Sequence, residues 1–154
     1  MFAILLSDMK FLENKKAHFD YEILEKFEAG IELLGFEVKS IKDGRGKVDG
    51  SHITVRGGEV YLVGASISPY QPKNTPEDYN PERNRRLLLT KKEIMTLSEY
   101  EKQRGLTIVP LLVYNKGSKI KIGIAVARGK KKFDKRETLK KRDTERDIRR
   151  SLKK

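Results

Sequence analysis

Apolar and charged side chains alternate along the chain from Phe19 to Leu33. The odd positions are apolar except for Glu25, and the even positions between them are mostly charged. A period of two over fifteen residues predicts a long β-strand with one buried face. Gly30 lies near the end of this segment, where a glycine favours a bend or a bulge. A long, bent strand favours a small barrel over a flat sheet.

Two further segments each predict a hairpin. Residues 52–67, HITVRGGEVYLVGASI, form two apolar runs around Gly57-Gly58, and paired glycines suit a two-residue turn because both accept positive φ. Residues 106–127 contain the apolar run LTIVPLLVY, the turn sequence NKGS and the returning run KIKIGIAVA. The apolar face of the returning strand consists of Ile120, Ile122, Ile124 and Val126.

Two helices and one long loop are predicted between these strands. Residues 35–46, GFEVKSIKDGRG, predict a short helix that ends at glycines. Thr90 and Glu93 match a capping box, which predicts a helix from Lys91 to about Arg104. Residues 68–84 contain four prolines and form a loop that is either functional or disordered. The element order predicts a mainly β fold with flanking helices, with an oligonucleotide-binding-like antiparallel β-barrel as the leading architecture.

Charge is distributed unevenly along the chain. The 154 residues carry a formal net charge of +12, and residues 128–154 contain 14 Lys and Arg but only 5 Asp and Glu. We therefore predict a nearly neutral body (1–127) followed by a basic C-terminal tail (128–154). A nearly balanced body with a basic arm indicates a polyanionic partner, either nucleic acid or an anionic membrane surface.

The tail has too few apolar side chains to fold by itself. Its large apolar residues are Phe133, Leu139, Ile148 and Leu152. Their burial would not offset the conformational entropy that the whole tail loses on ordering. We expect the tail to be disordered when free and to order against a polyanion, where neutralised phosphates release counterions. It lacks the coherent apolar face of a membrane-surface helix.

The residue types argue against catalysis and metal binding. The chain has no cysteine, and its two histidines, His18 and His52, have no partner at metal-ligand spacing. No nucleophile elbow, HExxH motif or phosphate-binding loop occurs. The apolar run from Phe2 to Leu6 is too short for a signal peptide or a membrane span. These observations predict a cytoplasmic protein that is not an enzyme and uses no cofactor or metal.

Two basic segments of the body are candidate binding elements. Asn14-Lys15-Lys16 precedes the long strand and is either a binding element or an ordinary solvated segment. Residues 81–94, PERNRRLLLTKKEI, form either an extended arginine-rich stretch suited to phosphates or a charged edge strand that resists aggregation. A barrel with basic surfaces and an arm that folds on binding favours structured RNA over DNA and lipid, because structured RNA is recognised mainly through its shape and phosphates. The rival function is a general single-strand-binding barrel with a non-specific arm, which needs aromatic stacking platforms, and an enzyme acting on RNA is more distant.

Five segments together resemble one known family. They are NKKA (14–17), FEAGIELLGFEVKSIKDG (27–44), NPERNRRLLLTKKEI (80–94), GLTIVPLLVY (105–114) and KIKIGIAVARGKKKFDKRETLKKRD (119–143). In this order they are similar to the tmRNA-binding proteins of the small protein B family, also called SsrA-binding proteins. The resemblance implies a variable N-terminal segment (1–13) ahead of an oligonucleotide-binding-like barrel domain (14–127). It also implies an adaptor without catalysis of its own. Such a protein binds the tRNA-like domain of tmRNA (SsrA RNA) as a monomer, replaces the anticodon arm and delivers the RNA to stalled ribosomes, in functional association with alanyl-tRNA synthetase and elongation factor Tu.

The resemblance also implies which residues of the body face the RNA. The expected residues are Asn14, Lys15, Lys16, Glu28, Arg83, Arg85, Arg86, Leu88 and Thr90. Glu28 would accept hydrogen bonds from base or ribose donors and so add specificity to a phosphate grip, with Leu88 in apolar contact beside it. Any RNA contact of Thr90 would compete with its helix-capping role.

In the tail, the resemblance implies contacts with the small ribosomal subunit. The segment from Lys130 to Arg136 is expected at the decoding centre, and residues 137–154 are expected to form a helix in the empty mRNA channel. The expected contact residues are Lys130, Lys131, Lys132, Phe133, Asp134, Lys135, Arg136, Lys140, Lys141, Arg142, Arg149 and Arg150. Phe133 would stack on a decoding base.

Overall fold

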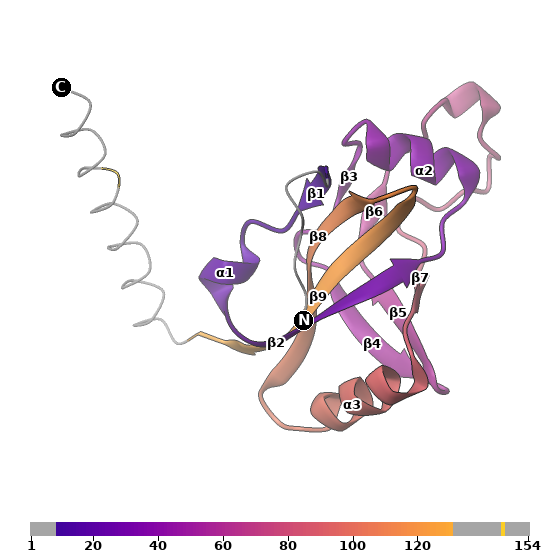
Figure 1. Cartoon of the computed structure of the whole chain (residues 1–154). Coiled ribbons are helices and arrows are strands. Elements are labelled where there is room, and N and C mark those ends of the chain that lie inside the picture. Colours follow the sequence, from indigo (N-terminus) through magenta and orange to yellow (C-terminus); the bar gives the residue numbers. More distant parts are fainter. Residues whose placement is uncertain (1–8, 131–145, 147–154) are drawn as a thin grey trace.

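The computed structural model describes residues 9–130 and Arg146 (Figure 1). Strands dominate the fold, as predicted. In chain order the elements are β1 (Lys10–Glu13), α1 (Ala17–Asp20), β2 (Tyr21–Ile31), α2 (Gly35–Lys42), β3 (Gly46–Lys47), β4 (His52–Arg56), β5 (Glu59–Val63), β6 (Ser66–Ile67), a 3₁₀ turn (Pro72–Asn74), β7 (Arg85–Leu88), α3 (Lys91–Glu101), β8 (Leu106–Lys116) and β9 (Lys119–Gly129).

Six of these strands close into a ring. Their order is β8-β4-β5-β7-β2-β9, β9 pairs back with β8, and every pairing is antiparallel. β1 adds to β8, so residues 10–13 belong to the sheet although the sequence places them in the N-terminal segment. β3 and β6 form a separate two-stranded sheet. The prediction of a mainly β fold with flanking helices is confirmed at this level.

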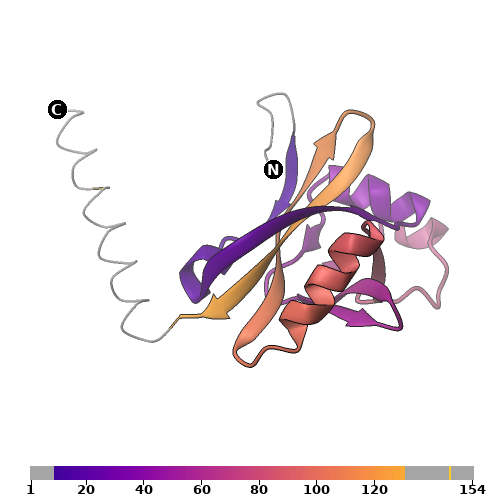
Figure 2. The same ribbon diagram turned by 60° about the horizontal axis from the view of Figure 1, so that its bottom comes forward.

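The two longer helices cover different ends of the ring. α2 and α3 lie far apart in Figure 1, and Figure 2 shows α3 in front of the ring. α3 contacts β4 and β8. Ile41 of α2 and Leu97 of α3 are fully buried, and both join the core cluster that contains Val60 and Ile122. Each helix therefore closes the apolar interior from its own side.

Several local predictions are confirmed. The Thr90 hydroxyl accepts a hydrogen bond from the Glu93 amide at 3.2 Å, and Glu93 Oε1 accepts one from the Thr90 amide at 3.1 Å, which is the predicted capping box. The helix ends at Glu101, somewhat earlier than predicted. Gly57 and Gly58 have φ values of 58° and 76°, and they join β4 to β5 as a hairpin.

The long alternating segment is shorter and less regular than its sequence indicates. α1 precedes it, so β2 begins at Tyr21. Its pairing with β9 shifts between Ile23 and Glu25, and this irregularity leaves the apolar side chain of Leu24 exposed. Before the shift Tyr21 and Ile23 are half-buried against a second apolar cluster, and after it Phe27 and Ala29 are buried in the main core, so the alternation continues on both sides of the shift but the apolar positions face different clusters.

β9 is covered on both of its faces. Ile122 and Ile124 point into the core of the ring, whereas Ala125 and Ala127 belong to a second cluster that includes Ala17 of α1. The small alanine side chains leave room for α1 on the outside of the ring. The end of β9, where the basic tail begins, is thus held next to α1.

β7 lies between β5 and β2, so the interpretation of residues 81–94 as a charged edge strand is wrong. Its side chains alternate, with Arg85 and Leu87 buried and Arg86 and Leu88 exposed. A strand that is paired on both sides has no free edge to protect.

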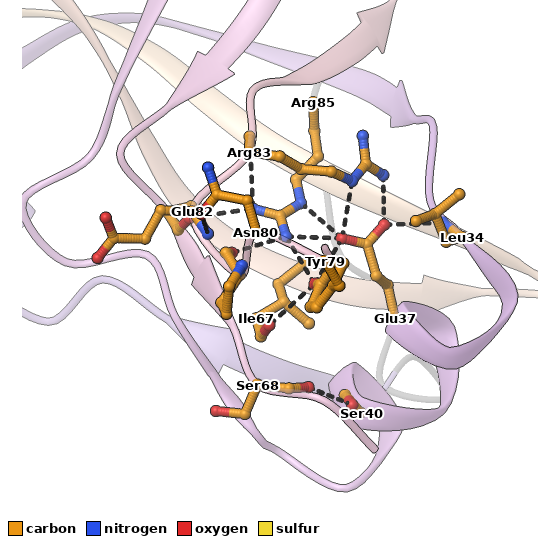
Figure 3. A network of polar contacts seen from close by, with 12 residues as sticks. Leu34, Glu37, Ser40, Ile67, Ser68, Tyr79, Asn80, Glu82, Arg83 and Arg85 are labelled. Carbon is orange, nitrogen blue, oxygen red and sulfur yellow. Dashed lines mark hydrogen bonds and ion pairs between the residues drawn. The ribbon is translucent and has the colours of Figure 1, made fainter. Parts of the chain in front are cut away.

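A buried ion pair joins α2 to β7 (Figure 3). The side chains of Glu37 and Arg85 are both 0% exposed, and Arg85 Nη2 and Nε donate to Glu37 Oε2 at 2.6 and 3.1 Å. Arg83 also donates to this carboxylate through Nε, at 3.1 Å, and through Nη2. Arg85 Nη1 donates to the carbonyl oxygens of Ala65 and Arg83, each at 3.0 Å, and Nη2 donates to that of Pro81 at 2.8 Å. Every nitrogen of the Arg85 guanidinium therefore has a partner.

The same cluster fixes the proline-rich loop. The Tyr79 hydroxyl lies 2.9 Å from Glu37 Oε2 and from the Ile67 carbonyl oxygen, and its ring meets Phe36 edge to face with centroids 4.7 Å apart. Burial and the hydrogen bond to Glu37 raise the pKa of Tyr79 to about 12. Nearby, Ser40 of α2 donates to the Ser68 carbonyl oxygen at 2.7 Å. The loop is tied to α2 through side chains of both.

The buried position of Arg85 corrects one expectation. Because this side chain has no exposed surface, it is not available to an RNA partner in this fold, and the expected contact is wrong. Arg83 is 29% exposed and has its guanidinium on Glu37. The guanidinium groups of Arg83 and Arg85 therefore both lie on Glu37 of α2.

Acid should destabilise the protein through Glu37. Burial alone would raise the pKa of this carboxyl group, but hydrogen bonds from Arg83, from the Leu34 amide and from Arg85 lower it to about 2. A depressed pKa in the folded state stabilises above the ordinary value of 4.5, and this stabilisation is lost as pH falls toward 2. We expect the free energy of unfolding to fall by about 3 kcal/mol over this window. Urea unfolding at a series of pH values measures it.

Glu37→Gln should remove this contribution to the pH dependence and cost about 3–5 kcal/mol at pH 7, because two arginines lose their counter-charge. Glu32→Gln is the matched control. Its pair with Arg86 is about half exposed, so the change should cost no more than about 1 kcal/mol. Equal pH slopes for the wild type and Glu37→Gln would contradict the assignment.

Candidate nucleic-acid interface

A carboxylate is held in place on the outer face of the ring. Glu28 of β2 accepts a hydrogen bond from the Tyr114 hydroxyl, and Lys116 Nζ donates to its two oxygens at 3.0 and 3.3 Å. Tyr114 and Lys116 both come from β8, on the far side of β9, where Gly123 pairs directly with Glu28. Because Gly123 has no side chain, the side chains of Tyr114 and Lys116 can reach from β8 across β9 to Glu28 on β2.

The surroundings of Glu28 keep its carboxylate ionised. Partial burial would raise its pKa, but the hydrogen bonds from Tyr114 and Lys116, together with the positive charges of Lys116 and Lys121, outweigh this and lower the pKa. The Glu28 side chain is 23% exposed, so the ion is reachable from solvent. An ionised carboxylate in a fixed orientation can only accept hydrogen bonds, which suits it to the N–H and O–H donors of a partner.

An exposed apolar side chain lies beside this carboxylate. Glu28 and Gly30 share one face of β2, and Gly30 pairs with Leu88 of β7 on one side and with Lys121 of β9 on the other. Leu88 is 47% exposed, and a Cβ added to Gly30 would lie 3.2 Å from its Cβ. The structure thus brings Glu28, Leu88 and a lysine onto one surface.

Arg86 and Thr90 lie on or next to the same strand, and both have partners. Arg86 forms ion pairs with Glu32 at 3.2 Å and with Glu59 at 3.3 Å, all of them substantially exposed. Exposed pairs of this kind hold their partners weakly, so the guanidinium can exchange them for a phosphate. Thr90 is exposed, but its hydroxyl also donates to Glu93 Oε1 at 2.9 Å and so belongs to the cap of α3.

The Asn14-Lys15-Lys16 segment divides into a structural residue and two exposed ones. Asn14 is buried, and its Nδ2 donates to the Pro110 carbonyl oxygen at 2.9 Å, so the amide holds the turn after β1. Lys15 and Lys16 are exposed in the turn that leads to α1. Glu28 pairs with Gly123 of β9, which pairs with Leu112 of β8, which pairs with Glu13 at the end of β1. The end of β1 is therefore three strands away from Glu28. The two lysines therefore border the outer face at a distance from Glu28.

Lys130 is the only expected tail contact that falls within the described residues. Its amide donates to the Asp20 carbonyl oxygen and its Nζ to the His18 carbonyl oxygen, each at 2.9 Å. Lys130 thus contacts α1 of its own chain. The other expected tail residues lie outside the described residues: Lys131, Lys132, Phe133, Asp134, Lys135, Arg136, Lys140, Lys141, Arg142, Arg149 and Arg150.

Across residues 9–130, no three His, Asp or Glu side chains come together in a way that could hold a metal ion. Nor is any of the helices described long and apolar enough to cross a membrane. Every Phe and Tyr side chain in this range is at least partly buried, so the described surface offers no fully exposed ring for base stacking.

The sequence analysis did not identify Glu37 or Tyr114, the two residues that hold the side chains of Arg83, Arg85 and Glu28 in place. Glu37 sits among apolar residues in a short helix, and its arginine partners lie more than forty residues away, so no local pattern reveals it. Tyr114 carried a weak signal. It is the last residue of the apolar run LTIVPLLVY, and a buried Tyr hydroxyl usually has a hydrogen-bond partner. Which partner it has depends on the register of three strands.

The fold and this surface define a small protein of the mainly β class, with a closed ring of strands and one fixed carboxylate among cationic and apolar side chains. A family model described as SmpB protein matches residues 11–154. The chain belongs to the SmpB family.

Individual proteins agree with this assignment. The chain is 49% identical to an SsrA-binding protein of Gloeothece citriformis over 141 residues, which is 92% of this chain and 91% of that protein. It is 47% identical over 148 residues to an SsrA-binding protein of a Sulfurihydrogenibium species, covering 96% of this chain and 97% of the other. A chain of the solved structure "tmRNA-SmpB: a journey to the center of the bacterial ribosome" matches with a TM-score of 0.65 and 42% identity, over 82% of this chain and 92% of that one.

Tyr114→Phe should raise the pKa of Glu28, because it removes one of the two hydrogen-bonding groups that favour the ionised form. Carboxyl NMR titration of Glu28 in the wild type and the variant measures the change. Tyr61→Phe is the control, since the Tyr61 hydroxyl donates to Glu59 at 2.5 Å on another part of the ring. An unchanged Glu28 titration in Tyr114→Phe would show that Tyr114 does not hold the carboxylate.

Proposed function

We propose that this chain binds the tRNA-like domain of tmRNA and delivers it to stalled ribosomes in trans-translation. The observation that carries this proposal is the nearly full-length similarity, at 47–49% identity, to SsrA-binding proteins. The structural likeness to a chain described together with tmRNA and the bacterial ribosome supports the same function. The protein acts as an RNA-binding adaptor in the cytoplasm, as a monomer, and not as an enzyme.

The outer face around Glu28 is the proposed grip on the tRNA-like domain. Its ionised carboxylate accepts hydrogen bonds from base or ribose donors, and Leu88 adds apolar contact. Arg86, Lys15 and Lys16 supply charge for phosphates at the edges of this face. Because a carboxylate repels phosphates, it penalises any RNA that does not place a donor at that point, and this is a source of specificity.

The ring and the tail have separate proposed roles. The ring acts as an oligonucleotide-binding-like barrel and takes the place of the anticodon arm, so that protein and RNA together have the outline of a tRNA. The tail enters the decoding centre and the empty mRNA channel, where message and tail compete for the same phosphate-lined space. The complex then works with alanyl-tRNA synthetase, which charges the RNA, and with elongation factor Tu, which delivers it.

Competition binding tests the grip. At about 200 mM salt, binding of the tRNA-like fragment should persist against an excess of poly-uridine, because specific contacts survive the screening that weakens phosphate contacts. Glu28→Gln should weaken this binding about tenfold, since a charged acceptor is replaced by a neutral amide. Glu22→Gln, at an exposed position of β2, is the control. A general single-strand binder would lose the fragment to poly-uridine, and that outcome would reject the adaptor function.

Deletion of residues 131–154 tests the division of roles. Lys130 is retained because it contacts α1. The truncated protein should bind the tRNA-like fragment within about threefold of the wild-type affinity, because its proposed grip is intact, but it should not support tagging of a nascent chain on ribosomes stalled without message. Fluorescence anisotropy and a reconstituted tagging assay measure the two activities. Parallel loss of both would contradict separate roles.

A further inference from the structure

A surface hollow of about 410 Å³ adjoins the proposed grip. It lies between the end of β2, the helix α2 and the start of β9, which adjoin one another in Figures 1 and 2. Its walls are apolar side chains from each of these elements and from β7. They are Ile31, Val38, Leu88 and Ile120, together with Leu33, which lies between β2 and α2. The volume falls within the usual range for small-ligand sites, so the hollow is large enough for one nucleotide but not for a duplex.

Three lysines surround this apolar hollow. Lys42 comes from the last turn of α2, and Lys119 and Lys121 come from β9. Among the described residues, none of the three forms a salt bridge, whereas Arg83, Arg85, Arg86 and Lys116 are all paired with carboxylates. Lys42 and Lys119 carry positive charge that no ion pair of the described residues neutralises, and Lys121 also acts on the carboxylate of Glu28. Cations placed around an apolar cavity are complementary to an anionic ligand with an apolar part.

The floor of the hollow connects it to Glu28. Gly30 lines the hollow and lies two residues beyond Glu28 on the same face of β2. Lys121 pairs with Gly30, and its charge also contributes to the lowered pKa of Glu28. A partner bound at Glu28 therefore extends directly over the hollow.

The wall that α2 contributes is held in place by a buried ion pair. Glu37 lies one residue before Val38 and holds the helix against β7 through its buried ion pair with Arg85. The hollow is therefore formed before a ligand arrives, which reduces the entropy cost of binding.

We infer that this hollow receives one unstacked nucleotide of the RNA, with its base against Leu88 and Ile120 and its phosphates facing Lys42, Lys119 and Lys121. RNA is read mainly in single-stranded loops, where bases can leave the stack and enter apolar sites, so the occupant is an unpaired nucleotide of a loop and not part of a stem. This inference rests on the proposed function, because it takes the tRNA-like domain as the partner.

Site-directed cross-linking identifies the occupant. The chain has no cysteine, so Lys42→Cys carries a single thiol to which a photoactivatable group can be attached. Lys39→Cys is the matched control. It lies on the same helix, but Lys39 faces the Tyr70 ring at 5.9 Å and does not line the hollow. With the bound tRNA-like fragment, the probe at position 42 should cross-link to one unpaired nucleotide. The probe at position 39 should not label that nucleotide.

A second experiment removes the positive charge at position 42 and measures the affinity for the tRNA-like fragment and its salt dependence. Lys42→Met should weaken binding of the fragment about three- to tenfold and reduce the slope of log affinity against log salt by about 1, as expected for one lost phosphate contact. Lys39→Met should change neither value. An abasic substitution at the cross-linked nucleotide should weaken binding to the wild type.

The outcomes separate the inference from the function on which it rests. If the wild type fails to bind the tRNA-like fragment at all, the proposed function is wrong, and the inference is wrong with it. If the wild type binds and Glu28→Gln weakens binding, but position 42 labels a stem or nothing and Lys42→Met behaves like Lys39→Met, then only the nucleotide site is refuted.

Discussion

The buried contact between Glu37 and Arg85 is the constraint on which the proposed RNA-binding face depends. Fully buried charges are tolerated only when they are paired and hydrogen-bonded, and here one carboxylate binds two guanidinium groups and a tyrosine hydroxyl. These groups come from α2, β7 and the proline-rich loop, so a single cluster sets the position of all three. The outer face and the hollow beside it take their shape from elements that this cluster holds.

The basic residues divide by chemistry between structure and binding. The planar guanidinium presents five donors, so Arg85 can satisfy a carboxylate and several carbonyl oxygens while buried. The compact, strongly hydrated ammonium group favours solvent, and the lysines of the outer face remain exposed or partly exposed. The number of basic residues in the sequence therefore overestimates the number of cations available to the proposed RNA partner. In the 81–94 segment, Arg83 and Arg85 both pair with Glu37 of the same chain.

The features that could be predicted from the sequence are those with a local signal, whereas features that depend on contacts between distant segments could not be predicted. The β4–β5 hairpin, the Thr90 cap and the β8–β9 hairpin are each indicated by a short local sequence, a turn or a cap, and all three were predictable. The irregularity in β2, the burial of Asn14 and the Glu37–Arg85 pair depend on contacts between segments far apart in the chain. The resemblance selected Glu28 and Leu88, which share a face, but residue types alone could not separate them from Arg85, which points inward.

The attachment of the basic tail has a mechanical consequence. β9 is hydrogen-bonded to β2 along one edge and to β8 along the other, and the first residue after it, Lys130, is fastened to the carbonyl oxygens of His18 and Asp20. A force on the chain directed along β9 would load both ladders in shear, so many hydrogen bonds would have to break together instead of one after another. Tension on the tail would thus reach the ring as a whole, and the protein could be drawn toward an anchoring point without unravelling from its end.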